Sequence, residues 1–317
     1  MTDTQNEVFK SPVNKIRLFE HGAPGSQNLK LTRKYYTEDM PDGRVKHIVQ
    51  NITDPDIVPY IPDGIGNSTD RQRIPAVLII PGGAFRRLVY NFEGEDVAKW
   101  LNSMGIAAFV LECRLPSDEH DNAEDVPLID AMRAMRVIRG RAQEFGIDEA
   151  KIGVMGFSAG GFMAALLSTA YESDVYADYK YKDEYDKLSA RPDFAVCSYP
   201  VISIDDCIEA GKRYMSEEQV LERISDSKAK ILHKYNPDKL VRPDMPPVFI
   251  CETDDDRTTL SENSVGFYMA ARKAGVSAEL HIFRTGGHGY GCGDDFAQTG
   301  EWKVLFTKWI KSIEIIS

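Results

Sequence analysis

Short apolar runs alternate with amphipathic stretches along most of the chain, starting at about residue 76. The runs have the length of buried strands, whereas the stretches between them show the period of helices. Strands are predicted at residues 76–80, 106–111, 151–155, 194–199, 248–251 and 278–283. Helices are predicted at residues 93–104, 126–145, 260–273 and 301–313, and a further helix starts at residue 159. This order is typical of βαβ units, so we expect an α/β fold with a mostly parallel, doubly wound sheet and helices on both faces.

Two further strand candidates, residues 45–52 and 58–62, precede this alternation. We expect them to add antiparallel pairing at the first edge of the sheet, because mixed sheets of this kind are common. The residues before them, 1–43, are interpreted as an N-terminal extension.

Two polar segments, residues 171–188 and 204–240, do not fit the alternation and are interpreted as small insertions near the substrate cleft. The first segment is rich in tyrosine, aspartate and lysine, and it is equally compatible with a solvated surface excursion. Single α/β domains commonly run past about 200 residues. We therefore expect one domain over residues 1–317.

Acidic residues outnumber basic ones: 49 Asp and Glu against 38 Lys and Arg give a net charge of −11. This charge would repel phosphate backbones and anionic membranes, so neither nucleic acid nor a membrane is expected as a partner. The N-terminus lacks the basic and apolar regions of a secretion signal, and no apolar run reaches the roughly 18 residues of a membrane span. The five cysteines are widely spaced, as free thiols are in a reducing compartment. We expect a cytoplasmic protein, and a homo-oligomer is compatible with the sequence.

The pentapeptide Gly156-Phe157-Ser158-Ala159-Gly160 lies between a predicted strand and a predicted helix. A nucleophile elbow occupies this place in α/β hydrolases, and its tight turn leaves no room for side chains beside the serine. The pentapeptide alone is weak evidence because its fixed positions hold common residues. Its place between strand and helix indicates that Ser158 is a nucleophile.

The loop Pro81-Gly82-Gly83-Ala84 follows the strand predicted at 76–80. In folds with a nucleophile elbow, this loop donates backbone N–H groups to the oxyanion, and small residues let the main chain approach the substrate carbonyl. An ordinary Gly-Gly turn would look the same, but the position upstream of an elbow favours the functional interpretation. Gly83, Ala84 and Ala159 are the candidate oxyanion-hole donors.

A serine hydroxyl needs a base that takes its proton, and the chain has six histidines. His288 lies in a glycine-rich loop after the last predicted strand, where this fold carries its catalytic histidine. His281 lies inside a predicted strand, where packing explains it. The others lie in polar or early segments that nothing connects to the cleft: His21, His47, His120 and His233.

The chain order serine, acid, histidine requires an acid between Ser158 and His288. Three candidates follow the strand predicted at 248–251: Asp254, Asp255 and Asp256. These aspartates, like the pair Asp294-Asp295, also raise the question of a metal, but the ligand spacings of zinc and calcium sites are missing. No phosphate-binding loop or dinucleotide fingerprint occurs, so we expect neither a metal nor a cofactor.

With these residues in view, the chain resembles the bacterial acetyl esterase and acetylxylan esterase-like (lipase/esterase) family of α/β hydrolases. The likeness runs from about Ile16 to the C-terminus. The matching segments before the elbow are 16–19, 23–25, 81–83, 93–94, 100–109, 114–116 and 146–148. Those at and after the elbow are 153–161, 189–194, 199–203, 255–256, 262–264 and 287–289. So long a collinear set is specific for the family.

The resemblance implies hydrolysis of short acyl esters, frequently acetyl groups on sugars, without a metal. It also ranks the acids, because matching residues 262–264 without gaps puts Asp256 on the catalytic acid and Asp255 on its acidic neighbour. The chain departs from the family pattern in three places. Glu252-Thr253 stands where His-Thr or His-Gly is usual, Thr259-Leu260 where Val-Pro is common, and Ala84 in place of a frequent third glycine.

Together, Ser158, Asp256 and His288 predict a serine carboxylesterase that acts on a small-molecule or oligosaccharide ester. An amidase or peptidase would use the same three residues, since the fold hosts both chemistries. A binding protein that has lost catalysis is the alternative from another class. A pure binder would not need the nucleophile, base, acid and oxyanion loop jointly, which argues against it.

Overall fold

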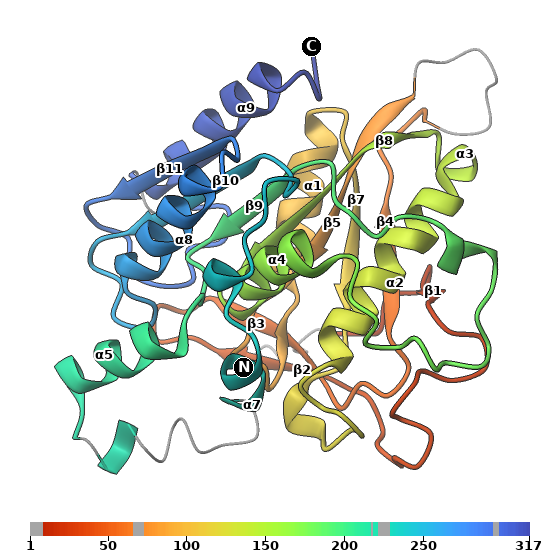
Figure 1. The fold of residues 1–317 in the computed structure, drawn as a ribbon, viewed down its shortest axis with the longest axis horizontal. Coiled ribbons are helices and arrows are strands. Elements are labelled where there is room, and N and C mark those ends of the chain that lie inside the picture. Colours follow the sequence, from red (N-terminus) through yellow and green to blue (C-terminus); the bar gives the residue numbers. More distant parts are fainter. Residues whose placement is uncertain (1–8, 66–72, 217, 221–228, 294–297) are drawn as a thin grey trace, which may run out of the picture.

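The computed structural model describes residues 9–65, 73–216, 218–220, 229–293 and 298–317. Within these residues an eight-stranded sheet forms the centre of the molecule, in the strand order β1-β4-β7-β5-β8-β9-β10-β11 (Figure 1). The strands are β1 (Ile16–Arg17), β4 (Asp56–Tyr60), β5 (Ile74–Ile80), β7 (Ala107–Glu112), β8 (Ile147–Phe157), β9 (Ala195–Ser198), β10 (Val248–Thr253) and β11 (Ala278–Phe283). Neighbours from β7 to β11 pair in parallel. The predicted mostly parallel, doubly wound fold is confirmed.

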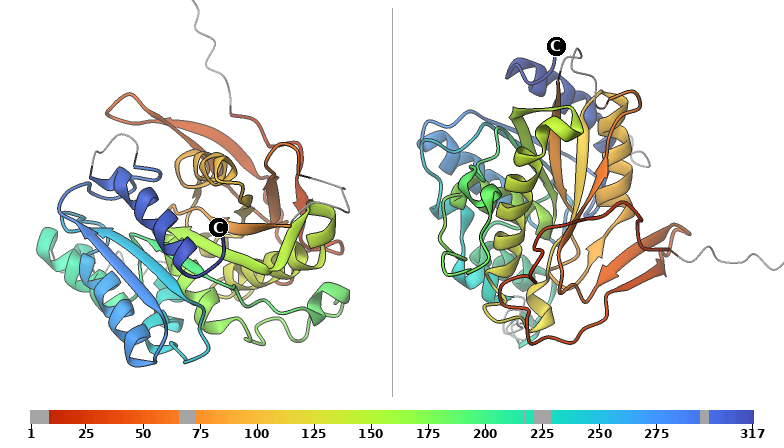
Figure 2. Two further views of the ribbon diagram at one scale, coloured as in Figure 1. Left: turned by 90° about the horizontal axis from the view of Figure 1, so that it is seen from above. Right: turned by 90° about the vertical axis from the view of Figure 1, so that its right-hand side faces the viewer.

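Helices cover both faces of this sheet (Figure 2). On one face lie α1 (Asp96–Ser103) and α9 (Trp302–Ser312), where Trp100 and Trp302 meet edge to face. On the other lie α2 (Val126–Gly140), α4 (Ala159–Ala170) and α8 (Ser261–Lys273). The helices α3 (Ala142–Phe145), α5 (Ile204–Tyr214) and α7 (Ala229–Lys234) lie between or outside these layers.

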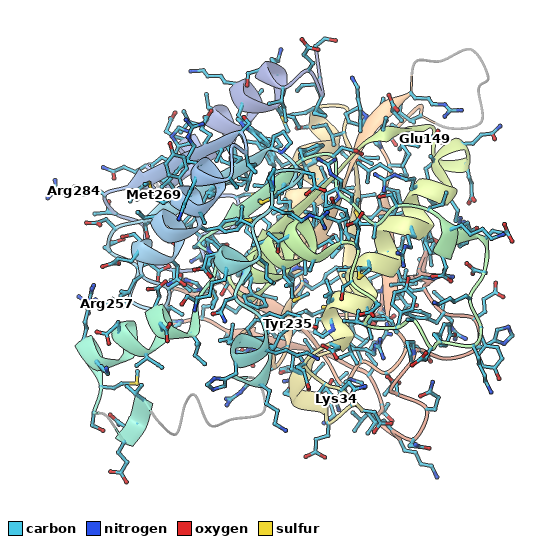
Figure 3. All side chains as sticks on the ribbon, in the orientation of Figure 1. Lys34, Glu149, Tyr235, Arg257, Met269 and Arg284 are labelled. Atoms are coloured by element: carbon cyan, nitrogen blue, oxygen red, sulfur yellow. The ribbon has the colours of Figure 1, made fainter. Side chains whose placement is uncertain are left out.

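The central strands are buried on both faces, which explains their continuous apolar sequences. Every residue of β7 is buried, and β5 is buried from its second residue onward. Side chains fill the space between the sheet and the helices, whereas Glu149, Met269 and Arg284 lie at the periphery (Figure 3). The core is therefore divided by the sheet into two apolar layers.

The prediction for the first edge of the sheet is partly wrong. β4 does pair antiparallel with β7, but the candidate strand 45–52 does not join the main sheet. Instead, β3 (Val45–Gln50) pairs with β2 (Lys34–Asp39) and β6 (Leu88–Val89) in a separate three-stranded antiparallel sheet. Asn51 follows β3 with a left-handed backbone (φ 58°), and the chain turns there before β4. The half-exposed, charged sequence of β2 gave no strand prediction.

Two predicted helices have different boundaries from those expected. The helix predicted at 93–104 begins as a π-helical turn, Asn91–Glu95, which continues directly into α1. The helix predicted at 126–145 is divided into α2 and α3 after Gly140. A Cβ on Gly140 would lie 2.3 Å from the ring of Tyr185, because the segment 171–188 packs closely against this end of α2.

The cysteines that the structure describes lie in the interior and form no disulfide. Cys113, Cys197, Cys251 and Cys292 are buried, and the side chain of Cys207 lies outside the described part of the chain. Among the helices described, none combines the length and the apolar composition that crossing a lipid bilayer requires.

A buried ion pair joins the end of β7 to α2. Arg114 and Asp130 have fully buried side chains, and the guanidinium donates to Oδ1 through Nη2 at 2.7 Å and through Nε at 3.0 Å. The backbone N–H of Arg114 donates to Oδ2 at 2.8 Å. Arg114 also donates to the hydroxyl of Ser26 at 2.9 Å and to the carbonyl of Pro24. One side chain thus fixes the N-terminal segment to the sheet and to α2.

We predict that Asp130→Ala lowers the free energy of unfolding by about 3–5 kcal/mol, because it leaves the Arg114 charge buried without its partner. Urea denaturation measures this loss. Glu184→Ala is the matched control: its partner Lys187 is exposed, and removing a surface pair should cost at most about 1 kcal/mol. Equal losses in the two variants would contradict the assigned role of the buried pair.

Candidate active site

Ser158 lies in the sharp turn between β8 and α4. Its backbone has φ 55° and ψ −119°, a strained conformation for a residue with a side chain. Neighbouring backbones touch at this turn: a Cβ on Gly156 would lie 1.9 Å from the carbonyl oxygen of Gly160, and a Cβ on Gly160 would lie 1.9 Å from that of Ile80. Both positions therefore require glycine, and the serine stands at the N-terminus of α4.

A chain of hydrogen bonds joins Ser158, His288 and Asp256. Ser158 Oγ lies 2.8 Å from His288 Nε2, and His288 Nδ1 lies 2.6 Å from Asp256 Oδ2. The three residues follow β8, β10 and β11, so the parallel sheet brings their loops to one edge. When Nδ1 carries the proton shared with Asp256, Nε2 can accept the serine proton. This is the arrangement of an activated nucleophile.

Asp256 is buried and held as a carboxylate. Its Oδ1 accepts from the backbone N–H groups of Thr258 at 2.7 Å and Thr259 at 3.0 Å, and its Oδ2 accepts from Thr259 Oγ1 at 2.9 Å. Burial alone would raise the pKa of Asp256, but the hydrogen bond and charge of His288 and these N–H groups hold that pKa below its ordinary value. The carboxylate can therefore stabilise a positive imidazolium on His288.

The other two acid candidates do not contact the imidazole. Asp255 is exposed, and its Oδ1 accepts from the backbone N–H of Gly287 at 2.8 Å. This bond fixes the start of the histidine loop, which is the segment after β11 that carries His288. Asp254 is also exposed, and its backbone N–H bonds to the carbonyl of Phe283 at 2.8 Å. The geometry favours Asp256 over both.

The loop after β5 passes directly beside the serine. A Cβ on Gly82 would lie 2.9 Å from the Cβ of Ser158. Gly83 (φ 139°) and Ala84 (φ 57°) both have positive φ, so the main chain bends sharply there. Ala159 is the first residue of α4, and its N–H belongs to the helix-terminal donors that have no acceptor within a helix. The three candidate donors thus lie on the two segments that flank the nucleophile.

Three buried polar residues of this region were not predicted as functional. The ring of Tyr199 packs edge to face on His288, with centroids 5.1 Å apart. Thr259 Oγ1 lies 3.2 Å from His288 Nδ1. Glu93 accepts a hydrogen bond from the backbone N–H of Gly82 at 2.8 Å. Glu93 and Tyr199 do lie in segments that match the family pattern, which was the only signal in the sequence.

Glu252, which replaces the usual histidine of the family, is a second buried carboxyl group near the acid. Its Oε1 accepts from the N–H of Thr253 at 2.9 Å, and its Oε2 from Ser264 Oγ at 3.3 Å. Burial and the negative charge of Asp256 raise the pKa of Glu252 well above its ordinary value. In its protonated form, Glu252 adds no second negative charge beside Asp256.

The remaining histidines have other surroundings. His281 lies in β11, where its Nε2 is 2.7 Å from Glu279 Oε1 and its ring contacts Phe249. His120 Nδ1 is 3.1 Å from Ser26 Oγ, and burial lowers its pKa to about 4. The other three are His21, whose ring lies tilted against that of Tyr181, His47, which stacks on Phe9, and His233, which lies in α7. The histidine that meets Ser158 is His288.

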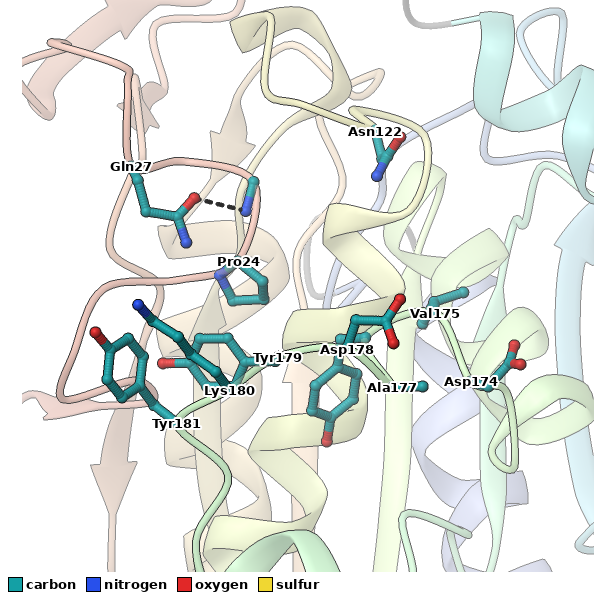
Figure 4. A pocket seen from close by; sticks show the side chains of 12 residues that line it. Pro24, Gln27, Asn122, Asp174, Val175, Ala177, Asp178, Tyr179, Lys180 and Tyr181 are labelled. Carbon is teal, nitrogen blue, oxygen red and sulfur yellow. Dashed lines mark hydrogen bonds between the residues drawn. The ribbon is translucent and has the colours of Figure 1, made fainter.

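The surface away from the serine has sizeable cavities but offers no metal site in its described part. No group of three or more described His, Cys, Asp or Glu side chains is arranged to hold a metal ion, and Asp294 and Asp295 lie outside the described residues. A surface cavity of about 370 Å³ lies between the loop 24–27 and the segment 174–181 (Figure 4). Its lining includes neither Ser158 nor His288.

A much smaller apolar cavity, of about 10 Å³, adjoins the oxyanion loop. Its walls include Gly82, Phe85, Pro127, Ala159 and Met163. A volume of this order holds about one group of the size of water.

Comparisons with known proteins identify the family of the chain. The family model BD-FAE matches residues 65–270. An acetylxylan esterase from Xylanibacter ruminicola is 31% identical over 240 residues, which are 75% of this chain and 45% of that protein. An endo-1,4-beta-xylanase B from Butyrivibrio fibrisolvens is 31% identical over 227 residues, which are 71% of this chain and 34% of that protein. The chain thus spans less than half the length of these two curated relatives.

A solved structure is similar over most of both chains. The acetyl ester-xyloside bifunctional hydrolase from Caldicellulosiruptor lactoaceticus is 37% identical, with a TM-score of 0.67, and the match covers 84% of this chain and 91% of that one. The resemblance to acetylxylan esterase-like α/β hydrolases, inferred from the motifs, is confirmed. The chain belongs to the BD-FAE family and has the α/β-hydrolase fold.

Proposed function

We propose that this chain is a serine carboxylesterase that hydrolyses short acyl esters, above all acetyl esters of sugars or xylo-oligosaccharides. The observation that carries the proposal is the hydrogen-bonded chain from Ser158 through His288 to Asp256 at a nucleophile elbow. A hydroxyl 2.8 Å from an imidazole nitrogen, whose other nitrogen meets a buried carboxylate, is positioned to lose its proton as it attacks.

In the first half of the reaction, Ser158 Oγ attacks the ester carbonyl carbon while His288 Nε2 takes the hydroxyl proton. The carbonyl oxygen becomes an oxyanion, to which the N–H groups of Gly83, Ala84 and Ala159 donate. The bond to the leaving alcohol then breaks, and the imidazolium returns its proton to the alcohol oxygen. Asp256 keeps the imidazole in the reactive tautomer throughout.

In the second half, water takes the place of the alcohol. His288 removes a proton from the water as it attacks the acyl-enzyme, and the same donors stabilise the second oxyanion. Ser158 leaves with the proton from His288, and the carboxylic acid is released. The cycle needs no group beyond these side chains and backbone N–H groups.

The acyl preference is supported by the small apolar cavity beside Gly82 and Ala159. We assign the acyl group to this cavity. Its lining includes neither Ser158 nor His288 but does include Ala159, the residue after the serine, and its small volume admits a longer chain only if Met163 or Phe85 moves. The preference for a sugar as the alcohol is supported by the names of two relatives, an acetylxylan esterase and an acetyl ester-xyloside hydrolase.

We predict that Ser158→Ala lowers kcat on nitrophenyl acetate by about 10⁴-fold or more, because no other group can form the acyl-enzyme. The same variant should lose labelling by a fluorophosphonate probe while keeping its far-ultraviolet circular dichroism. Near wild-type turnover would show that Ser158 is not the nucleophile. Turnover of an aryl acetamide faster than that of nitrophenyl acetate would favour the amidase alternative.

The base is tested by a pair of histidine variants. His288→Ala should be nearly as damaging as Ser158→Ala, because the serine loses its proton acceptor. His281→Ala is the control, since its ring contacts Glu279 and Phe249, and it should keep kcat within about threefold of the wild type. A greater loss of kcat in His281→Ala than in His288→Ala would show that His281, and not His288, acts as the base.

Single asparagine substitutions rank the three acids. Asp256→Asn should lower kcat by up to about 10⁴-fold, because the wrong imidazole tautomer is then favoured. Asp255→Asn keeps an oxygen that can accept from Gly287, so we expect a loss of about tenfold or less. Asp254→Asn should be nearly silent. A largest loss at 254 or 255 would overturn the assignment of Asp256.

The acyl cavity gives a preference for short chains. We expect kcat/KM on nitrophenyl acetate to exceed that on the butyrate, and to exceed that on the octanoate by about tenfold or more, since a longer chain must displace buried side chains. Met163→Ala enlarges the cavity and should shift the preference towards the butyrate. Higher efficiency on octanoate in the wild-type enzyme would be incompatible with the assigned cavity.

A further inference from the structure

Glu93 is a buried carboxyl group next to the serine site that the reaction steps above do not use. It lies in the π-helical turn Asn91–Glu95, and each of its oxygens accepts one hydrogen bond. Oε2 accepts from the backbone N–H of Gly82 at 2.8 Å, and Oε1 accepts from the hydroxyl of Tyr199 at 3.0 Å. π-Helical turns within α-helices are frequent at functional sites.

The first of these bonds reaches the oxyanion loop, Pro81-Gly82-Gly83-Ala84. A Cβ on Gly82 would lie 2.7 Å from Glu93 Oε2 and 2.9 Å from the Cβ of Ser158, so the carboxyl group, the loop and the nucleophile are packed together. The N–H of Gly82 donates to Glu93, and the next two N–H groups, those of Gly83 and Ala84, are the donors assigned to the oxyanion in the proposed mechanism. Glu93 thereby orients the segment that carries the donors.

The second bond reaches the histidine loop. The hydroxyl of Tyr199 donates to Glu93 and accepts from the backbone N–H of Gly291 at 3.0 Å. The Tyr199 ring packs edge to face on the imidazole of His288. A Cβ on Gly291 would lie 2.5 Å from the carbonyl oxygen of Phe92, so the π-helical turn also touches this loop directly.

The acid loop, which is the segment after β10 that carries Asp256, is connected to Glu93 through Tyr199. The carbonyl oxygen of Tyr199 lies 3.3 Å from Thr259 Oγ1, the hydroxyl that donates to Asp256 Oδ2 at 2.9 Å. Burial raises the pKa of Glu93, while the charge of His288 and the two hydrogen bonds oppose this shift. Since each oxygen of the carboxyl group receives one hydrogen bond, from Gly82 N–H or from the Tyr199 hydroxyl, Glu93 acts as an acceptor towards both loops.

We propose that Glu93 is a positioning residue, which through Gly82 and Tyr199 fixes the oxyanion loop relative to the histidine and acid loops. The proposal rests on the proposed serine hydrolase function. Loss of Glu93 would leave Ser158, His288 and Asp256 in place but let the oxyanion donors shift. Small displacements of this kind cost rate rather than ground-state binding.

The test compares four variants in the full chain: Glu93→Gln, Glu93→Ala, Tyr199→Phe and Glu95→Gln. Glu95 lies in the same turn but pairs with the exposed Lys99, so Glu95→Gln is the matched control. The primary readout is the second-order rate constant for labelling Ser158 with a fluorophosphonate, which needs the nucleophile, the base and the oxyanion donors but no ester substrate. The kcat and KM on nitrophenyl acetate and the melting temperature are measured beside it.

We expect Glu93→Ala to lower the labelling rate constant and kcat by about 10²-fold, the size of the loss when one oxyanion donor is removed, with KM changed by less than about threefold. Glu93→Gln keeps one acceptor oxygen and should lose about tenfold, as should Tyr199→Phe, whereas Glu95→Gln stays near the wild type. The double variant Glu93→Gln/Tyr199→Phe should lose less than the product of the single losses, because the two residues share one hydrogen bond.

A labelling rate constant for Glu93→Gln within about twofold of the wild type would overturn the proposal, and so would a loss that appears only in KM. A lowered melting temperature with an unchanged labelling rate of the folded protein would show a structural role alone, which also overturns it. Failure of the proposed function looks different: wild-type protein would label with the fluorophosphonate but not turn over esters, and the labelling rates of the variants would still decide the role of Glu93.

Discussion

The sharp turn at Ser158 is the constraint on which the rest of the structure depends. A residue held in such a conformation costs on the order of 1–3 kcal/mol and persists only where its surroundings determine it completely. Here Gly156 and Gly160 let two backbone segments approach each other and the end of β5 so closely that no Cβ would fit. The strands β5 and β8 must therefore be rigid next to this turn, and the burial of β5 and of the second half of β8 by apolar side chains makes them so.

The loops around this turn are held in a different way. The segments after β5, β10 and β11 are short of apolar side chains, so hydrophobic packing cannot fix them. Buried polar groups fix them instead, because Asp256 accepts from the acid loop itself, Glu252 from the end of β10, and Glu93 from the oxyanion loop. Burial of such groups is tolerated only where their hydrogen bonds are made, which makes each of these contacts specific for one arrangement of the loops.

The strands are fixed by apolar packing and the loops by polar contacts. This difference explains which parts of the fold could be predicted from the sequence. Strands such as 76–80 were recognisable because burial on both faces produces continuous apolar runs. The strand at 45–50 was recognisable as a strand but was assigned to the wrong sheet, because an alternating pattern does not name the partner strand. Its actual partner, β2, alternates exposed and half-buried residues and carries too many charges to stand out.

In the site, too, some residues are marked by their neighbours in the sequence, whereas others are brought together only by the fold. Ser158 and His288 were predicted because glycine-rich turns mark them locally. Asp256 was preferred to Asp254 and Asp255 mainly through the family pattern, and to Asp254 also because that residue lies nearer the strand end. Glu93 and Tyr199 carry no local mark, since they are 106 positions apart and meet only in the folded chain. Contacts of this kind follow from the three-dimensional arrangement of the sheet edge, which a single sequence does not specify.

The position of the imidazole shows why the polar contacts come from several elements. His288 lies in a loop without strand pairing, and part of its side chain is exposed. Its loop is fixed instead by side chains that bond to its backbone at two points. Thr253 and Asp255 hold Gly287, while Tyr199 and Trp302 hold Gly291. Because these four side chains come from β10, the acid loop, the end of β9 and α9, the loop that carries the imidazole is fixed from several sides of the site.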